Sequence, residues 1–484
     1  RSRGLGDVYK RQGLGHFVVP TAQERGLRLR SGFIPIAALG DFLASKNIPY
    51  SSRAGEGVFS LYPLPNHPAG PFGEHNYSQA KRIEGTGTIF SYKLDWYLSA
   101  AHSFFARYNI TGDNSILPFT SEAIDSSLAT DTRTQNIATF LNSTFSSHAN
   151  ALRFSYGRTR LAFPARQSSP LLFGSSARDA STVPAAQVIN TPYGSFGPFG
   201  ATGPVGQLSI LPYSPIGVDV YNFPQGRADN TFQVSDFFTR TTTAHSLKFG
   251  FDIRRSQLNS FADRNSRPLL MFGYGKVSMG CMSDPDCIFA TEDGWLRGAD
   301  LAALGAPSGF LQTISTDPYP DTTIGLRFTQ YDFFVQEDWK ARPNLTLNMG
   351  LRYELQTTPT EVNRRIERTF GLTPADFGHL KPSGSVRDQI IISNGNLAFD
   401  TALEALQAFI AGREKIYDAD RRRFGPRFGL AWDPFGDGTT AIRAGYSLSF
   451  DANLGAVTSQ SRNVFPTFVP LNLDLNFSPP SGLV

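Results

Sequence analysis

Two cysteines and two aspartates in one polar stretch are the residues whose types and spacing come closest to site chemistry. Cys281 and Cys287 lie six positions apart in this 484-residue chain, with Asp284 and Asp286 between them. Because the chain has only two cysteines and they are neighbours, we expect a local disulfide formed in an oxidising compartment. Two unrelated thiols are the alternative, and zinc is not expected because no histidine pair lies nearby. The two carboxylates could hold Ca²⁺, but an ordinary polar loop explains them better.

No other combination of residues predicts catalysis. The sequence has no phosphate-binding G-x-x-x-x-G-K-[ST], no H-E-x-x-H zinc motif and no G-x-S-x-G nucleophile motif. Its seven histidines are scattered, and none pairs with another at the spacing of metal ligands. Glu337 and Asp338 precede Trp339 near a strand end, where a solvated rim explains them better than acid–base catalysis. We therefore expect no enzyme activity, no metal and no cofactor.

The composition favours an aromatic, weakly charged β-protein. Charged residues make up 18% of the chain and aromatic residues 13%, with 40 Phe and 17 Tyr. Abundant aromatics with few charges suit a barrel that has a polar interior and a lipid-facing exterior. No apolar run is long enough for a transmembrane helix. The net charge of +4 comes without a basic run, so nucleic acid is not expected as a partner.

The residues that could line a site depend on long alternating strands. In the stretch from Leu345 to Leu355, apolar residues alternate with polar or small ones, and a strand places these on opposite faces. The run matches the roughly 9–11 residues of a tilted strand that crosses a bilayer. The same pattern predicts five hairpins: 84–96 with 102–111, 132–145 with 150–160, 230–240 with 245–258, 330–340 with 345–357, and 424–434 with 439–451.

The connections alternate between short and long. Within each hairpin only a few residues form the turn, such as Ala341 to Asn344, whereas most connections between hairpins run from roughly twenty to seventy residues. Outer-membrane barrels have this asymmetry, with short periplasmic turns and long extracellular loops. The predicted fold is therefore an all-β, antiparallel transmembrane barrel, of which about ten strands are present.

Two sets of strand residues receive a functional interpretation. Arg254, Arg352, Glu354 and Arg443 are expected to face the lumen, where they would contact a plug or a passing substrate. Their alternative role is to pair with each other and with water. Trp96, Trp339, Trp432, Tyr353 and Tyr446 are expected at the lipid interface. Their alternative role is core packing in a soluble sheet.

Several phrases carry a resemblance to a known family. The segments from Tyr331 to Glu354 and from Phe424 to Asp451 resemble TonB-dependent outer-membrane receptors, in particular the Oar-like subgroup with an N-terminal carboxypeptidase-regulatory-like domain. The segments from His245 to Asn259, from Leu61 to Asn66 and from Thr231 to Phe238 are similar to the same group. The resemblance implies a 22-stranded barrel with an internal plug. It also implies ligand uptake powered by the inner-membrane TonB complex.

The chain departs from this pattern at both ends, because we find no plug, no TonB box and no terminal aromatic residue. We expect residues 1–12 to be an adaptor or cloning scar. Residues 13–76 are expected to be a plug-to-barrel region or an early barrel loop, and residues 77–484 part of a barrel in the outer-membrane lipid. The expected ligand is small, such as an oligosaccharide, a peptide or a metal chelate. A surface adhesion or structural barrel without active transport is the alternative function.

Overall fold

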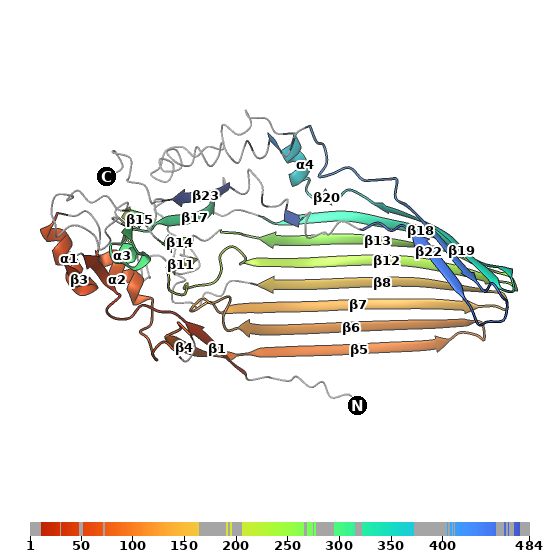
Figure 1. Ribbon diagram of the computed structural model, residues 1–484, viewed down its shortest axis with the longest axis horizontal. Coiled ribbons are helices and arrows are strands. Elements are labelled where there is room, and N and C mark those ends of the chain that lie inside the picture. The colour runs from red at the N-terminus through yellow and green to blue at the C-terminus, as the bar shows by residue number, and fades with distance from the viewer. Residues whose placement is uncertain are drawn as a thin grey trace.

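One long antiparallel sheet dominates the computed structural model (Figure 1). Ten strands form its continuous path in the order β22-β21-β19-β18-β13-β12-β8-β7-β6-β5, and β20 (Thr360–Glu361) pairs with β18 beside that path. The prediction of a partial antiparallel barrel with about ten strands is confirmed. The structure describes residues 11–29, 31–47, 52–70, 73–163, 190–191, 194–195, 206–265, 269–273, 275–276, 295–314, 322–371, 404, 407–408, 410, 412–451, 459–460, 463 and 469–474.

The ten strands form the five predicted hairpins, and most strands extend further toward the long connections than predicted. The pairs are β5 (Gly85–Tyr97) with β6 (His102–Leu117), β7 (Leu128–Thr144) with β8 (His148–Phe163), β12 (Gln225–Thr241) with β13 (His245–Ala262), β18 (Ile324–Arg342) with β19 (Leu345–Gln356), and β21 (Phe424–Trp432) with β22 (Ile442–Ser447). All five turns lie at one end of the sheet, which we call the turn end (Figure 1).

The register divides the sheet into an apolar face and a polar face. Directly paired residues share a face, so Phe154 on β8, Val234 on β12, Ile253 on β13 and Tyr331 on β18 lie on one side. Their neighbours in the sequence lie on the other side, which carries Ser155, Gln233, Arg254 and Gln330 in the same four strands. Asp236 and Glu337 are carboxylates on the apolar face, and each has a partner, namely Asn150 at 2.6 Å and His245 at 2.6 Å.

A second region, which we call the cap, lies at the other end of the sheet (Figure 1). It consists of residues 11–83 together with the described parts of 118–127, 206–224, 265–314 and 469–474. Its N-terminal part contains β1 (Arg11–Phe17), β2 (Gly26–Leu29), β3 (Gly32–Pro35), α1 (Ile36–Ser45), α2 (Ser52–Ser60) and β4 (Tyr77–Ile83). The later connections supply β11 (Gln207–Ile210), β14 (Leu269–Phe272), β15 (Gly275–Lys276), β16 (Trp295–Leu296), α3 (Gly298–Ala303), β17 (Gly309–Ile314) and β23 (Val469–Asp474).

The cap has a conventional apolar core. Phe17, Leu27, Leu39, Ile210 and Phe272 are fully buried and belong to one cluster that joins the N-terminal part to the later connections. This cluster explains why segments far apart in the sequence assemble here, because burying their apolar side chains removes them from water.

Polar contacts reinforce the cap core. The Arg25 guanidinium donates hydrogen bonds to four carbonyl oxygens, those of Pro20, Phe59, Tyr62 and Pro63, at 2.6 to 3.3 Å. The Tyr62 hydroxyl donates to the carbonyl oxygen of Ser214 at 3.0 Å. These bonds satisfy backbone acceptors that burial would otherwise leave unpaired.

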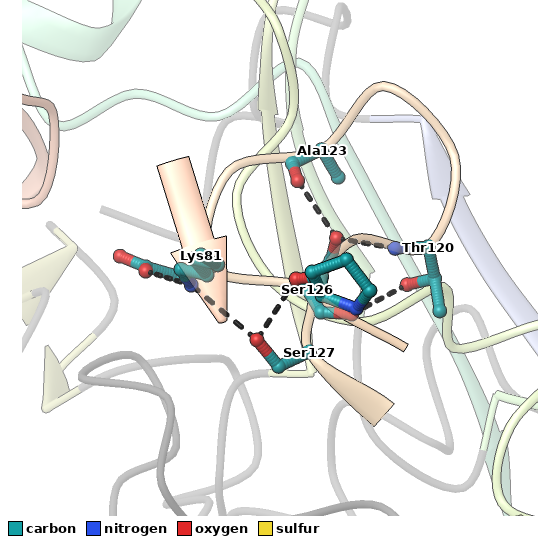
Figure 2. A network of polar contacts seen from close by, with 7 residues as sticks. Lys81, Thr120, Ala123, Ser126 and Ser127 are labelled. Carbon is teal, nitrogen blue, oxygen red and sulfur yellow. Dashed lines mark hydrogen bonds and ion pairs between the residues drawn. The ribbon is translucent and has the colours of Figure 1, made fainter. Parts of the chain in front are cut away.

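Residues 118–127, which join β6 to β7, fasten the cap to the sheet (Figure 2). Ser126 Oγ accepts from the Thr120 amide at 2.7 Å and donates to the Ala123 carbonyl oxygen at 2.7 Å, so the segment is held by its own side chains. Lys81 on β4 makes an ion pair with Asp125 at 2.7 Å. The β1–β4 pair is therefore connected to the barrel strands through this segment.

The first described residues belong to a strand. Arg11 and Gln12, which we expected to belong to a cloning scar, form the start of β1 and pair with Ile83 and Arg82. A strand ladder uses backbone groups and accepts any side chain, so the expected origin of residues 1–12 stays a prediction. Residues 1–10 lie outside the described residues. Among the residues that the structure describes, no helix has the length and apolar character needed to cross a membrane.

Three short elements complete the described chain. They are β9 (Asn190–Thr191), β10 (Gly194–Ser195) and α4 (Arg365–Phe370). Ile366 and Phe370 of α4 pack against Ile324 and Leu326 at the start of β18, in a small cluster of their own. This cluster covers the cap end of β18.

Candidate functional site

A cavity of about 490 Å³ opens in the sheet near its cap end. Four adjacent strands, β8, β12, β13 and β18, form its wall, and Ser459 and Gln460 border it from the C-terminal segment. Thr231, Ser256 and Phe328 in its lining belong to the polar face by register. The cavity therefore opens on the side of the sheet that would be the lumen of a barrel.

The lining of the cavity is rich in hydrogen-bonding groups. Apolar side chains such as Leu161, Phe163 and Phe328 supply part of the wall. The remaining positions on the polar face and in the C-terminal segment are mainly amides, hydroxyls and one charged pair: Gln225, Arg227, Asp229, Thr231, Ser256, Ser260, Ser459 and Gln460. Asn230 and Gln257 also border the cavity, but they lie on the apolar face by register. A pocket with apolar walls and many polar groups is suited to a polar ligand that has apolar patches.

The charged pair leaves one acceptor unused. Arg227 Nε lies 3.6 Å from Asp229 Oδ2, and Asp229 Oδ1 is buried without a hydrogen-bond partner among the described residues. Asn230 lies on the apolar face by register, where its Oδ1 accepts from the Tyr156 hydroxyl at 2.9 Å and from Arg158 at 3.1 Å. On the polar face, the cavity offers a carboxylate oxygen of Asp229 that could accept from a bound group.

A charged layer follows the cavity along the polar face toward the turn end. Asp252 and Asp332 lie directly opposite each other on β13 and β18. Arg352 of β19 bonds to Asp332 at 3.3 Å and to Glu354 at 2.5 Å, while Gln233 donates to Asp252 at 2.5 Å. Like charges on adjacent strands repel each other, and the positive charge of Arg352 offsets part of this repulsion by pairing with Asp332 and Glu354.

A layer of aromatic rings and cations lies still closer to the turn end. Phe105 and Phe140 contact edge to face with ring centroids 5.3 Å apart, and Phe237 lies 5.7 Å from Phe334. Arg153 bridges the two pairs, at 5.3 Å from both the Phe140 and the Phe237 rings. Lys93 lies over Phe105 and Lys248 over Phe237, at 5.3 and 5.8 Å. Each contact has cation–π geometry.

Gly250 makes room for this layer. A Cβ atom at this position would lie 2.2 Å from the Asp236 carbonyl oxygen and 3.0 Å from the Phe237 ring. Gly250 pairs with both Phe237 and Phe334, so the two rings can meet across it. A larger residue here would separate them.

The structure brings together three of the four predicted lumen residues. Arg254, Arg352 and Glu354 lie on the polar face in the charged layer, and Arg352 bonds to Glu354. Arg443 lies on the same face but on the outer strand β22, where no ion pair joins it to another described residue. It is therefore separate from the charged layer.

The predicted interface aromatics all lie on the apolar face, at different heights. Trp96 pairs with Phe104, Trp339 with His245 and Trp432 with Ile442, and these three tryptophans lie near the turn end. Tyr446 lies four residue pairs further along the strand from the Trp432 pair. Tyr353 pairs with Phe333 and Phe424 toward the cap end. The five residues thus do not form a single row.

The predicted cysteine site cannot be placed. Cys281, Cys287, Asp284 and Asp286 lie outside the described residues. Within the described part of the chain, no group of three or more His, Cys, Asp and Glu side chains is positioned to hold a metal ion.

Neither the ring layer nor the cavity was predicted from the sequence. Consecutive phenylalanines were an available signal for the rings, since Phe104-Phe105, Phe237-Phe238 and Phe333-Phe334 must each place one ring on either face of a strand. The cavity had no such signal, because its lining comes from four strands and a distant segment.

Comparison with known proteins identifies a family over nearly the whole chain. A family model described as "Outer membrane beta barrel domain" matches residues 10–482. A search of curated proteins found no match. Solved structures similar to the chain include the outer membrane transporter YddB from Escherichia coli, with 11% identity, a TM-score of 0.38, and coverage of 77% of this chain and 33% of that one.

Two further structures have comparable similarity. FpvA of Pseudomonas aeruginosa bound to heterologous pyoverdines has 11% identity and a TM-score of 0.35, covering 78% of this chain and 39% of that one. The siderophore receptor PiuA from Acinetobacter baumannii has 9% identity and a TM-score of 0.32, covering 76% and 42%. The chain therefore spans between a third and about two fifths of the length of these structures.

Proposed function

The chain belongs to the family of outer membrane β-barrel domains and lies in the outer membrane, and from this premise we propose that it is a receptor and transporter of the TonB-dependent kind. A small polar ligand binds at the cap end, enters the cavity on the polar face and passes along that face toward the turn end. The inner-membrane TonB complex supplies the energy. Ligand binding and release involve no covalent chemistry.

The cavity is the observation that carries this proposal. Its position near the cap end of the polar face is where a ligand arriving through extracellular loops first meets the barrel wall. Its amides and hydroxyls offer both donors and acceptors, and the buried Asp229 oxygen favours a ligand with a hydroxyl or ammonium donor.

The layers beyond the cavity support a path. Arg254, Arg352 and Glu354 lie next to the cavity on its turn-end side and offer polar contacts to a passing ligand. The ring layer lies still closer to the turn end. In this proposal Arg443 lines the same lumen on β22, the edge strand of the sheet. Residues 13–76 act as an early extracellular loop region, because they pack with the later connections in the cap.

The apolar face completes the proposal. Trp96, Trp339 and Trp432 anchor the turn end at the lipid interface, and Tyr353 and Tyr446 contact lipid further along the strands. A Cys281–Cys287 disulfide would stabilise an extracellular connection.

The test compares ligand uptake in cells that carry the protein and in cells that lack it. The probes are radiolabelled maltohexaose, a labelled tripeptide and a ferric hydroxamate chelate. Thr231→Trp fills the cavity and should lower uptake of the transported probe about tenfold, the loss of roughly 1.4 kcal/mol of binding. Phe232→Trp changes the next residue, on the apolar face, and should leave uptake unchanged.

Energy coupling is tested in the same cells. A protonophore should abolish accumulation of the transported probe while surface binding persists. If the probes bind but none accumulates with an intact proton gradient, the protein is an adhesion or structural barrel and not a transporter.

A further inference from the structure

Three of the strands that follow a short turn begin with histidine. These residues are His102 on β6, His148 on β8 and His245 on β13. The register places all three on the apolar face, where His102 pairs with Ser143, His148 with Arg240 and His245 with Trp339. They form, with Arg240, a row at the turn end that we call the histidine row.

The imidazoles lie among the rings of the apolar face. Phe145 contacts His102 at 5.7 Å and His148 at 4.8 Å between ring centroids. His148 stacks on Phe238 at 5.8 Å, and His245 stacks on Trp339 at 5.9 Å with the ring planes 7° apart. A flat side chain with an apolar body and a polar edge is suited to the boundary between acyl chains and headgroups.

Each imidazole uses one nitrogen within the protein and leaves the other available. Nδ1 bonds to Ser143 Oγ at 2.8 Å in His102, to Ser147 Oγ at 3.2 Å in His148 and to Glu337 Oε1 at 2.6 Å in His245. None of the three Nε2 atoms has a hydrogen-bond partner among the described residues. In His102 and His148 the neighbouring serine can donate to Nδ1, so the ring proton lies on Nε2, which is then a donor. In His245 the Nδ1 atom donates to the Glu337 carboxylate, which fixes the orientation of that ring.

The charges of the row favour an anion. Arg240 is an exposed, permanently positive residue beside His148. Glu337 is the carboxylate on this stretch of the apolar face nearest the row, and its Oε1 is bonded to His245. The Nε2 atoms of His102 and His148, together with Arg240, therefore present donors and positive charge where the apolar face ends.

We propose that the histidine row binds the phosphate groups of phospholipids in the periplasmic leaflet of the outer membrane. The row continues the apolar face of an outer membrane barrel, so the occupant next to it is lipid. The phosphate offers acceptor oxygens at the depth where the acyl chains end, and its charge complements Arg240. This inference concerns the lipid contact of the barrel and does not depend on transport.

Phospholipid binding to the purified full chain tests the proposal. Native mass spectrometry measures the apparent affinity for phosphatidylglycerol in the wild type and in the triple variant His102→Gln/His148→Gln/His245→Gln. We expect the triple variant to bind about tenfold more weakly, because the two Nε2 donors of His102 and His148 and the ring surface of all three imidazoles are lost. The matched control is His16→Gln/His67→Gln/His75→Gln in the cap, which should bind as the wild type does. Equal affinity in the two triple variants would overturn the proposal.

A second measurement uses only the wild type, so it does not depend on how the variants fold. Nitrogen-15 NMR of labelled histidines follows the three imidazoles as phosphatidylglycerol or phosphate-free monogalactosyl diacylglycerol is added. The Nε2 signals of His102 and His148 should shift with phosphatidylglycerol alone. Equal shifts with both lipids would show that the row senses acyl chains and not phosphate, and the proposal would be wrong.

Discussion

The sheet and the cap use the same kinds of apolar residues in opposite ways. In the cap, Phe17 and Phe272 are 1% and 0% exposed. In the sheet, Phe249 and Phe333 are 44% and 46% exposed, although they belong to the best-paired strands of the molecule. The cap has its apolar groups inside and its polar groups outside, whereas the sheet has an exposed apolar face and a polar face with a cavity.

This difference shows how the surroundings determine what a hydrophobic pattern stabilises. The cap is surrounded by water and gains stability by removing phenylalanines from it. The apolar face of the sheet gains nothing in water, and its exposed rings become favourable only when acyl chains cover them. Substitutions in the two regions should therefore have different costs.

The largest effect is expected from a cavity in the cap core. Phe272→Ala removes a fully buried ring and should lower the free energy of local unfolding of the cap by about 3–5 kcal/mol. Amide hydrogen exchange of α3 measures this local free energy. Phe333→Ala, which removes a ring from the apolar face of the sheet, should leave exchange in α3 unchanged. Equal effects of the two substitutions would mean that the regions are not separate.

A charge on the apolar face should give the next largest effect. Val335→Arg places a guanidinium against lipid and should cost about 2–4 kcal/mol of folding free energy in a bilayer. Gln336→Arg changes the next residue, on the polar face, and should be nearly neutral. Guanidinium titration of the protein in lipid vesicles measures both. Similar costs at the two positions would contradict the assignment of faces.

Loss of the Arg25 guanidinium should weaken the cap alone. Arg25→Met leaves the carbonyl oxygens of Pro20, Phe59, Tyr62 and Pro63 short of a donor, with an expected cost of about 1–3 kcal/mol. Arg28→Met is the control, because the Arg28 side chain is exposed and should matter by less than about 0.5 kcal/mol. Hydrogen exchange of α2 distinguishes the two variants. If hydrogen exchange of α2 is unchanged in Arg25→Met, the Arg25 guanidinium does not stabilise the cap.

Alkaline pH should destabilise the cap before the sheet. Burial raises the pKa of both Tyr62 and Tyr213 above the ordinary value of 10. The folded cap then holds these protons more tightly than the unfolded chain does. The stabilisation is complete below pH 10 and falls as the pH rises further, by about 1.4 kcal/mol per pH unit for each tyrosine.

Hydrogen exchange of α3 between pH 9 and 11, corrected for intrinsic exchange, measures this slope. The variant Tyr62→Phe/Tyr213→Phe should lose it, and Tyr97→Phe at an exposed position of the sheet should retain it. A slope that survives in the double variant would assign the effect to other groups.

The sequence predicted the sheet well because its information is local. Alternation from Leu345 to Leu355 and the short turn before it specify a strand, its faces and its partner within thirty residues. The same alternation placed Arg254, Arg352 and Glu354 on the polar face. The ring layer was not predicted, because Phe105 and Phe237 are apolar residues on a face that alternation marks as polar.

The cap could not be predicted for the opposite reason. Its contacts join residues far apart in the sequence, such as Tyr62 with Ser214 and the Arg28 amide with the Asp300 carboxylate. Neither segment carries a periodic signal for the other, since turns and short strands of this composition can pack in many ways. The cavity shares this difficulty, because Ser459 and Gln460 meet β12 only in the folded chain.

The central claim is that the apolar face of the sheet lies in lipid. Alternating lipid contact along β18 tests it most directly. In a Cys281→Ser/Cys287→Ser background, single cysteines along β18 are labelled with a bimane fluorophore in vesicles that contain lipids spin-labelled on the acyl chain. We expect strong quenching at Tyr331, Phe333 and Val335 and weak quenching at Asp332, Phe334 and Gln336. Equal quenching at all six positions, or the reverse pattern, would contradict a barrel wall with its apolar face in lipid.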